Sequence, residues 1–199
     1  MKKIILFTLV LFYSLSANAA LNIPHIKLEL AKLEGSKDKN TGLAKCEELM
    51  TQINQEDKGD KNSAEFYTWK GIVTAKMAHY RKSLSLAKET KNLLEKAIII
   101  DEKNSDAAAL NALGIMYHRV PRFISFGDNK KSEEYFKRAI SASSNLDTNW
   151  RYGEFLMEIG KKEEGLKLLK IALSKASQEK PDEKIKEKII QEMIRKYES

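Results

Sequence analysis

The sequence predicts an all-α protein, a right-handed α-solenoid of about four helix hairpins followed by a C-terminal capping helix. Two observations predict this class. Apolar residues recur at helical spacing through most of the chain, and no stretch after the first 19 residues alternates as a half-buried strand does. In addition, a glycine and a large–small pair of residues recur from one predicted hairpin to the next, which is the mark of an internal repeat.

The repeat is clearest between residues 107 and 173. Gly114 and Gly153 each lie in a predicted first helix, and the second helix then places a large side chain three residues before a small one. Two helices approach closely only where no bulky side chain separates them, so glycine and alanine are expected at such contacts. The large–small pairs are Leu94/Ala97, Phe136/Ala139 and Leu169/Ala172.

The same patterns set the helix boundaries. They place hairpins at about 26–54, 64–101, 107–140 and 146–173, and a capping helix at 181–198. Ser105 and Asp106 are expected to cap the first helix of the third hairpin. The last helix begins at Pro181, and its apolar face is expected to cover the last hairpin. The alternative, a helix lying on a membrane surface, is disfavoured by the acidic residues along it.

The first 19 residues have the features of a secretory signal peptide. Two lysines form a basic start, an apolar run of 12 residues extends from Ile4 to Leu15, and small residues precede the expected cleavage between Ala19 and Ala20. A helix of that length spans roughly 18 Å, whereas the core of a bilayer is about 30 Å thick. A membrane anchor is therefore disfavoured, and the pattern predicts export to a bacterial periplasm.

The remaining residues, 20–199, are predicted to form one domain with nearly balanced charge. Without the two lysines of the signal peptide, the 35 basic residues fall to 33, which against 28 acidic residues leaves a formal charge of +5. Lysines are interleaved with glutamates, whereas a nucleic-acid footprint would gather basic residues on one face. Cys46 is the only cysteine, and its position on an apolar helical face predicts a buried thiol rather than a reactive one.

No constellation for catalysis or metal binding is found in the sequence. The three histidines, His25, His79 and His118, stand without a second histidine or a carboxylate at ligand spacing. Neither a glycine-rich phosphate loop, a nucleophile elbow nor a CxxC pair occurs. The chain is therefore predicted to be a non-enzymatic protein that holds neither a cofactor nor a metal.

One loop departs from the plain repeat. The turn of the third hairpin is about six residues longer than that of the last hairpin. Pro121 is expected to end the preceding helix, Gly127 to permit a tight turn, and Asp128 to cap the helix that follows. Phe123 and Phe126 are expected to fold back beneath the loop. The alternative is that these two aromatic residues close an apolar ligand pocket between hairpins.

Several segments resemble a group of exported bacterial tetratricopeptide-repeat (TPR) proteins. They are Trp69-Lys70-Gly71-Ile72, Leu94-Glu95-Lys96-Ala97-Ile98, Leu113-Gly114 with Tyr117, Val120-Pro121 through Phe126-Gly127-Asp128, Asp147 with Asn149, and Tyr152-Gly153 with Phe155-Leu156. The resemblance covers about 66–173 and implies a non-enzymatic periplasmic protein. More distantly, the chain is similar to the TPR component associated with tripartite transporters of small organic ligands. It departs from the group at Arg122 and Phe123, and at Ser132, where the repeat prefers alanine.

TPR proteins bind along a concave groove lined by one face of each first helix, and the aligned glycines locate that face here. The resemblance implies these groove residues: Thr68, Ile72, Lys76, Asn111, Ile115, His118, Arg119, Trp150, Glu154 and Met157. Trp150 is expected to anchor a partner, and the alternative is that it packs between repeats.

Two functions remain open at this point. The first is a periplasmic scaffold or adaptor that holds a protein or peptide partner in the groove. The alternative is a small-ligand carrier for a hydrophobic molecule or an organic anion, associated with a transport system. Neither nucleic-acid binding nor a transmembrane segment after cleavage is expected.

Overall fold

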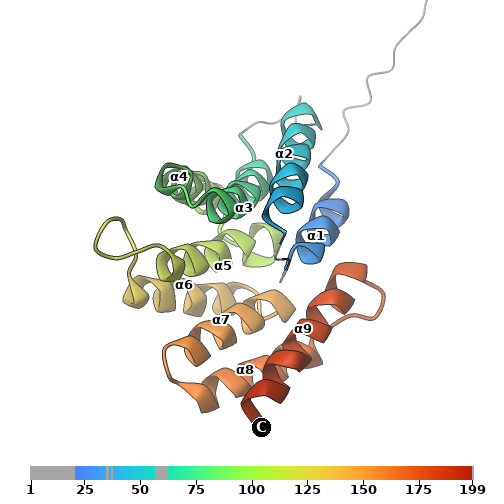
Figure 1. Ribbon diagram of the computed structural model, residues 1–199, viewed down its shortest axis with the longest axis vertical. Helices are drawn as coiled ribbons and strands as arrows, with labels where there is room; N and C mark the ends of the chain where they lie inside the picture. Colours follow the sequence, from blue (N-terminus) through green and yellow to red (C-terminus); the bar gives the residue numbers. More distant parts are fainter. Residues whose placement is uncertain (1–20, 35, 37, 57–61, 199) are drawn as a thin grey trace, which may run out of the picture.

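The computed structural model describes residues 21–34, 36, 38–56 and 62–198, which form nine α-helices and no strand, so the predicted all-α class is confirmed (Figure 1). The helices are α1 (Ile23–Lys32), α2 (Lys39–Glu56), α3 (Ala64–Arg81), α4 (Leu84–Asp101), α5 (Asn104–Arg119), α6 (Asn129–Ala142), α7 (Leu146–Glu158), α8 (Lys162–Ser174) and α9 (Pro181–Glu198). None of these helices is long and apolar enough to cross a membrane. The predicted signal peptide and its cleavage site, Ala19 and Ala20, lie outside the described residues.

Three pairs of consecutive helices pack as hairpins, α3 with α4, α5 with α6 and α7 with α8. Neighbouring hairpins join through α4 with α5 and through α6 with α7. The first helices α3, α5 and α7 also contact one another in succession. In Figure 1 the three hairpins follow one another from α3/α4 near the top to α7/α8 below, with α1 and α9 on the right.

Within the hairpins, a glycine of the first helix faces a large side chain of the second. A Cβ on Gly71 would lie 2.7 Å from Leu94 Cδ2, and a Cβ on Gly114 would lie 2.8 Å from the Phe136 ring. The third hairpin repeats the close approach at Gly153. In each hairpin, the recurring glycine of the first helix therefore contacts the recurring large side chain of the second helix, as the sequence pattern indicates.

A buried polar residue strengthens the middle hairpin. Ser132, which stands where the TPR pattern prefers alanine, is fully buried, and its hydroxyl donates a hydrogen bond of 2.7 Å to the Gly114 carbonyl oxygen. A buried hydroxyl is tolerated when it is hydrogen-bonded. The serine therefore joins α6 to α5 without leaving a polar atom unpaired.

The first and last helices do not follow the hairpin arrangement. The sequence predicts a hairpin over 26–54. The two helices share a buried cluster that includes Ile26 and Cys46, but the main backbone contacts of α2 are with α3 and those of α1 are with α9. α9 places Ile190 and Ile194 in the core of the last hairpin, where a capping helix was expected to lie. Because α1 and α9 also meet, the two ends of the helical stack are in contact.

The only cysteine is part of the core beneath α1 and α2. Cys46 is a free thiol, fully buried in a cluster with Ile26, Leu49 and Phe66, so the predicted buried position is confirmed. Burial raises the pKa of this thiol to about 11. A thiol that stays protonated at neutral pH is a packing group rather than a nucleophile.

The start of α5 differs from its prediction. Ser105 and Asp106 do not cap the helix, because together with Ala107 they adopt φ angles of 51°, 58° and 62°, in the left-handed region. That conformation costs a non-glycine residue about 1–2 kcal/mol. Two contacts hold the turn: the Ser105 hydroxyl accepts a hydrogen bond of 3.2 Å from Trp69 Nε1, and the Asp106 carbonyl oxygen accepts one of 3.1 Å from Asn145 Nδ2. The turn thus joins α3 and α7 to the start of α5.

The long loop between α5 and α6 is fixed at its base. The helix ends two residues before Pro121, as expected. Asp128 caps α6 by accepting hydrogen bonds of 2.8 and 3.3 Å from the backbone N–H groups of Lys130 and Lys131, the second and third residues of that helix. Gly127 passes so close to the Val120 carbonyl group that a Cβ would collide with it. Glycine is needed there for close approach rather than for an unusual φ angle.

The tip of the same loop is exposed. Phe126 packs edge-on against Tyr117, with ring centroids 5.4 Å apart, whereas Phe123 is 98% exposed and Ile124 is 68% exposed. The expectation that both aromatic residues fold back is therefore met by Phe126 and is wrong for Phe123. The physical reason is that Phe126 has an apolar neighbour on α5, while Phe123 extends beyond any such surface.

The helix contact at Gly114 leads to a test of the packing. Replacing Gly114 by alanine should destabilise the fold by about 1–2 kcal/mol, because overpacking against Phe136 outweighs the roughly 1 kcal/mol that alanine contributes to helix propensity. Urea unfolding followed by circular dichroism measures this difference.

A double-mutant cycle separates the contact from the propensity effect. In a Phe136→Leu background, the smaller side chain relieves the collision, so Gly114→Ala should cost measurably less than in the wild type. A Gly114→Ala variant at least as stable as the wild type would show that the two helices move apart freely.

Candidate functional site

A cavity of about 750 Å³ lies at the centre of the molecule, among five helices. Its walls are the first helices of the three hairpins, α3, α5 and α7, and it is bounded by α1 and α9. Apolar side chains such as Leu30, Ile72, Ile115 and Met116 line it together with charged ones. The cavity lies on the side of the hairpins formed by their first helices, and it remains partly open between α1 and α9.

Six of the ten predicted groove residues line this cavity. They are Ile72 and Lys76 from α3, Asn111, Ile115 and Arg119 from α5, and Glu154 from α7. The groove face was predicted only by aligning the glycines of the three first helices, and the structure brings these side chains together around one cavity.

The other four predicted residues are placed elsewhere. Thr68 is fully buried in α3, and His118 lies beside α7, where its Nε2 is 2.6 Å from a Glu158 oxygen. Trp150 and Met157 are 1% and 4% exposed and belong to the core that α7 shares with α8 and α9. Trp150 thus packs between helices, which was the alternative to its role as an anchor.

The difference on α7 is that Arg151 lines the cavity instead of its neighbour Trp150, which lies roughly 100° away around the helix. The charged residues of α7 that line the cavity are Asp147, Arg151 and Glu154, at spacings of four and three, and Leu146 and Thr148 line it beside them. Trp150 does not line the cavity and packs with Ile190 and Ile194 of α9. The docking of α9 therefore decides which side of α7 lies inward.

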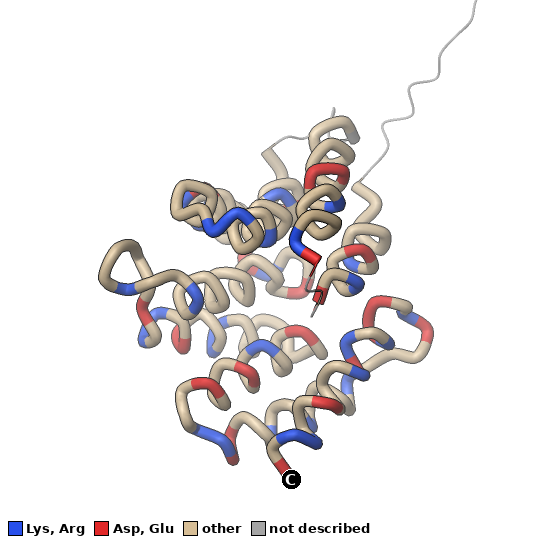
Figure 2. The backbone as a smooth tube through the Cα atoms, viewed as in Figure 1, with Lys and Arg blue, Asp and Glu red and all other residues tan. Residues whose placement is uncertain are grey.

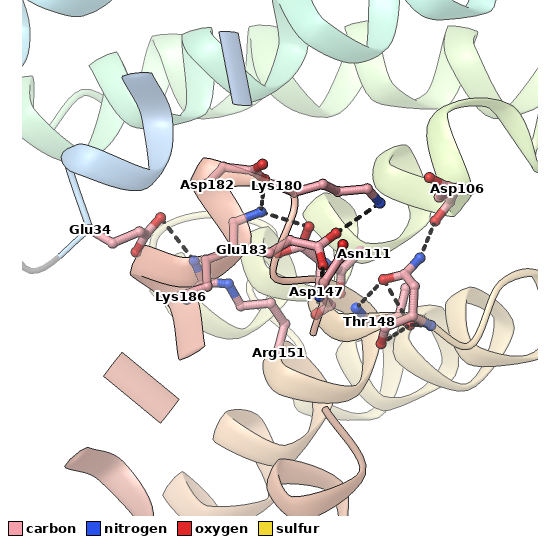
Figure 3. Close-up of polar contacts among 12 residues, drawn as sticks. Glu34, Asp106, Asn111, Asp147, Thr148, Arg151, Lys180, Asp182, Glu183 and Lys186 are labelled. Carbon is pink, nitrogen blue, oxygen red and sulfur yellow. Dashed lines mark hydrogen bonds and ion pairs between the residues drawn. The ribbon is translucent and has the colours of Figure 1, made fainter. Parts of the chain in front are cut away.

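The cavity contains an ion-pair network centred on Glu34, the second residue after α1. One carboxylate oxygen, Oε1, lies 3.1 Å from Lys76 Nζ on α3 and 2.8 Å from Arg151 Nη2 on α7. Arg151 Nη1 then donates to Glu154 Oε2 at 3.0 Å. Figure 3 shows Glu34 and Arg151 facing each other across the gap between α1 and α7.

The network continues to the C-terminal end of α5, where His118 and Arg119 lie. Arg119 Nη2 lies 3.5 Å from Glu154 and 2.7 Å from Glu158, and Glu158 also contacts His118. Cationic and anionic groups therefore alternate from Lys76 to Glu158, and His118 contacts the last carboxylate of the series. Side chains of four helices, or of their immediate ends, contribute to this series.

The electrostatics of Glu34 and Arg151 follow from this geometry. Burial alone would raise the pKa of Glu34, but the Arg151 guanidinium and the Lys76 ammonium outweigh it and lower the pKa to about 2. Burial likewise opposes the charge of Arg151, and Glu34 and Glu154 outweigh that effect and raise its pKa. Both groups are therefore charged at neutral pH, each stabilised by the other.

A second cluster of charges closes the cavity at the N-terminal ends of α7 and α9. Lys186 Nζ lies 2.8 Å from Asp147 Oδ2 and 3.1 Å from Asp182 Oδ2, as Figure 3 shows. Burial would lower the pKa of Lys186, but the two carboxylates raise it. Lys180 pairs with Glu183 at 3.0 Å on the same rim. These contacts fix α9 to α7 at the rim of the cavity.

Among the described residues, two side chains that line the cavity have a buried polar atom without a hydrogen-bond partner, the Tyr80 hydroxyl and the Asn111 amide oxygen. Asn111 is 7% exposed, and its Oδ1 is buried and accepts no hydrogen bond from any described residue. Its Nδ2 reaches the Asp147 carbonyl oxygen only at 3.4 Å. An unpaired buried acceptor is unfavourable, so a donor supplied from the cavity would improve this site.

Lysine or arginine and aspartate or glutamate are interspersed along the helices, as Figure 2 shows. Within the described part of the chain, no group of three or more His, Cys, Asp or Glu side chains is placed to hold a metal ion. The central cavity is accordingly the place where apolar surface, charge and an unpaired acceptor come together.

Sequence reasoning missed Glu34 and Arg151, the centre of the network. The available signal on α7 was a polar stripe, Asp147, Arg151 and Glu154, running beside the apolar stripe of Leu146 and Trp150. Choosing the polar stripe as the inner face would have found Arg151. Glu34 carries no comparable signal, since it follows a helix end and pairs with residues distant in sequence.

Comparison with known proteins does not assign the chain to a family. No protein-family model matches the sequence, and no curated protein matches it. The TPR resemblance therefore stands on its motifs, and the function has to be argued from the site.

The depressed pKa of Glu34 leads to a pH-dependent stability. The folded-state pKa of about 2 lies below the ordinary value of 4.5, so ionised Glu34 stabilises the fold at neutral pH and this contribution is lost as pH falls from 4.5 toward 2. That pKa difference corresponds to roughly 3 kcal/mol at most. Glu34→Gln should therefore lower stability by about 2–3 kcal/mol at pH 7, and by progressively less below pH 4.5.

Glu102→Gln is the matched control for this measurement. Glu102 pairs with Arg138 at 2.6 Å, but both side chains are more than one-third exposed, so its loss should cost less than about 1 kcal/mol at any pH. Urea unfolding at several pH values measures both variants. Equal losses for the two variants at pH 7 would contradict the special role of Glu34.

Proposed function

We propose that this chain is a non-enzymatic binding protein of the TPR type, and that it holds a small organic ligand in its central cavity. The three consecutive hairpins with their glycine contacts support a right-handed TPR-like solenoid. The single observation that carries the function is the partly open cavity of about 750 Å³ lined by α3, α5 and α7. Among the described residues no metal-binding group competes with this use.

The size and lining of the cavity favour a small ligand over an extended one. Pockets for small molecules typically measure about 300–1,000 Å³ and combine apolar walls with a few polar groups. Ile72, Ile115 and Met116 supply apolar surface, while Lys76, Arg151 and the unpaired acceptor of Asn111 supply polar contacts. This combination suits an organic anion with an apolar part, so the carrier interpretation is preferred here.

The adaptor function is retained as a second candidate because of one observation on the outer surface. Phe123 and Ile124 are exposed at the tip of a loop whose base is fixed. Neither Phe123 nor Phe126 lines the cavity, so this loop does not close a ligand pocket. An exposed apolar tip on a fixed loop suits contact with a protein partner.

A periplasmic location completes the proposal. It rests on the basic start, the short apolar run and the small residues before Ala20 in the sequence. A carrier in that compartment would meet small solutes that have crossed the outer membrane.

The proposal is tested by identifying what the protein carries. The tagged mature protein is purified from a periplasmic extract, and bound small molecules and proteins are identified by mass spectrometry. A small organic anion is expected with the wild type, and Ala108→Phe, which places a ring in the cavity, should reduce its amount at least about tenfold, the equivalent of 1.4 kcal/mol.

Two further variants separate the candidates. A double variant, Phe123→Ser with Ile124→Ser, should leave the bound anion unchanged. A protein partner that is lost in this double variant and kept in Ala108→Phe would instead establish the adaptor function. A wild-type protein that carries no small molecule, and whose melting temperature no organic anion raises, would contradict the carrier proposal.

A further inference from the structure

The contact between Glu34 and its two cations has the form of an occupied carboxylate site. A single oxygen of Glu34 meets Lys76 Nζ at 3.1 Å and Arg151 Nη2 at 2.8 Å. All three side chains face the cavity and are at most 23% exposed. Two cations from two different hairpins thus converge on one carboxylate inside the cavity that a ligand would enter.

The guanidinium is held in place independently of Glu34. Arg151 lies over the Trp150 ring, with Cζ 3.7 Å from the ring centroid, and Trp150 itself is 1% exposed. Arg151 Nη1 is also bound to Glu154 at 3.0 Å. A cation that is stacked on a buried ring and tied to a second carboxylate keeps its position when one partner leaves.

Glu34 is the member of the group that is easiest to replace. Lys76 and Arg151 lie within the helices α3 and α7 of the hairpins, whereas Glu34 follows the end of α1, which belongs to no hairpin. A carboxylate on a ligand would make the same contacts. Removal of Glu34 without replacement would leave buried positive charge with too few partners, which is unfavourable.

An unpaired acceptor in the cavity wall points to a ligand independently of the ion pairs. Asn111 Oδ1 is buried, lines the cavity from α5 and accepts no hydrogen bond within the described chain. A ligand that carries an N–H or O–H donor would satisfy it. The two observations together describe an organic carboxylate that also bears a hydrogen-bond donor.

We propose that Lys76 and Arg151 form a carboxylate-binding subsite of the cavity, that Glu34 fills this subsite in the structure, and that the carboxylate of the ligand replaces Glu34. This inference rests on the proposed carrier function, because it names the ligand class of the same cavity. It also assigns a role to α1, whose end blocks the subsite until a ligand enters.

Chemical rescue with propionate, the free counterpart of a glutamate side chain, tests the subsite. Glu34→Ala should have a lower melting temperature than the wild type, and sodium propionate should raise it by about 2–4 °C more than sodium chloride at the same ionic strength. Propionate should not raise the melting temperature of the wild type beyond the chloride effect. Glu102→Ala, which empties the exposed pair with Arg138, should gain nothing from propionate.

A second variant covers the case in which Glu34→Ala does not fold. Glu34→Gln preserves the volume of the side chain, and saturation-transfer NMR should show propionate binding at least about tenfold tighter than to the wild type. Adding Arg151→Met to Glu34→Gln should abolish that binding. Propionate that neither stabilises Glu34→Ala nor binds Glu34→Gln better than the wild type would overturn the subsite.

The two proposals fail in different ways. A propionate effect confined to the Glu34 variants would support the subsite even if the purified wild type carried no small molecule and no organic anion raised its melting temperature, in which case the carrier function would be wrong. A bound organic anion in the purified protein, without any propionate effect in the Glu34 variants, would keep the carrier function and remove the subsite.

Discussion

The architecture depends on one steric constraint, that two helices of a hairpin come together only where a side chain is missing. Gly71 and Gly114 provide that gap, and the side chains of Leu94 and Phe136 fill it. Because the contact recurs once in each hairpin, successive hairpins acquire similar geometry and stack with their first helices on a common side. The surface that α3, α5 and α7 form together therefore follows from the positions of these glycines.

Enclosing that surface changes what it can do. An open concave face offers room to a long segment, whereas the contact between α1 and α9 limits the space to a cavity of small-molecule size. Inside it the charges alternate, so that each buried cation has a carboxylate partner and the net electrostatic cost of burial stays low. Such a lining is stable without a ligand, and on the inference drawn above a ligand carboxylate would enter it by replacing Glu34.

Local features of the sequence were enough to predict the all-α class and the position of the contact at Gly114, since helical periodicity and a recurring glycine are visible within a single hairpin. The inner face of α7 was not predictable in the same way. Trp150 and Arg151 are adjacent, and α9, a distant segment, determines which of them is covered. The role of Glu34 was even less predictable from the sequence, because its partner Lys76 lies 42 positions further along the chain and its partner Arg151 lies further still. A local sequence pattern cannot predict an ion pair between residues that are so far apart in the chain.

The contact between α1 and α9 also has a consequence for the order of folding. The hairpins are built from neighbouring segments and their contacts close only short loops, whereas joining α1 to α9 closes a loop that contains almost every other helix. Contacts between distant segments carry a larger entropy cost and form more slowly than local ones. The hairpin stack is therefore expected to assemble first with its concave side open, and enclosure of the cavity is the last event of folding.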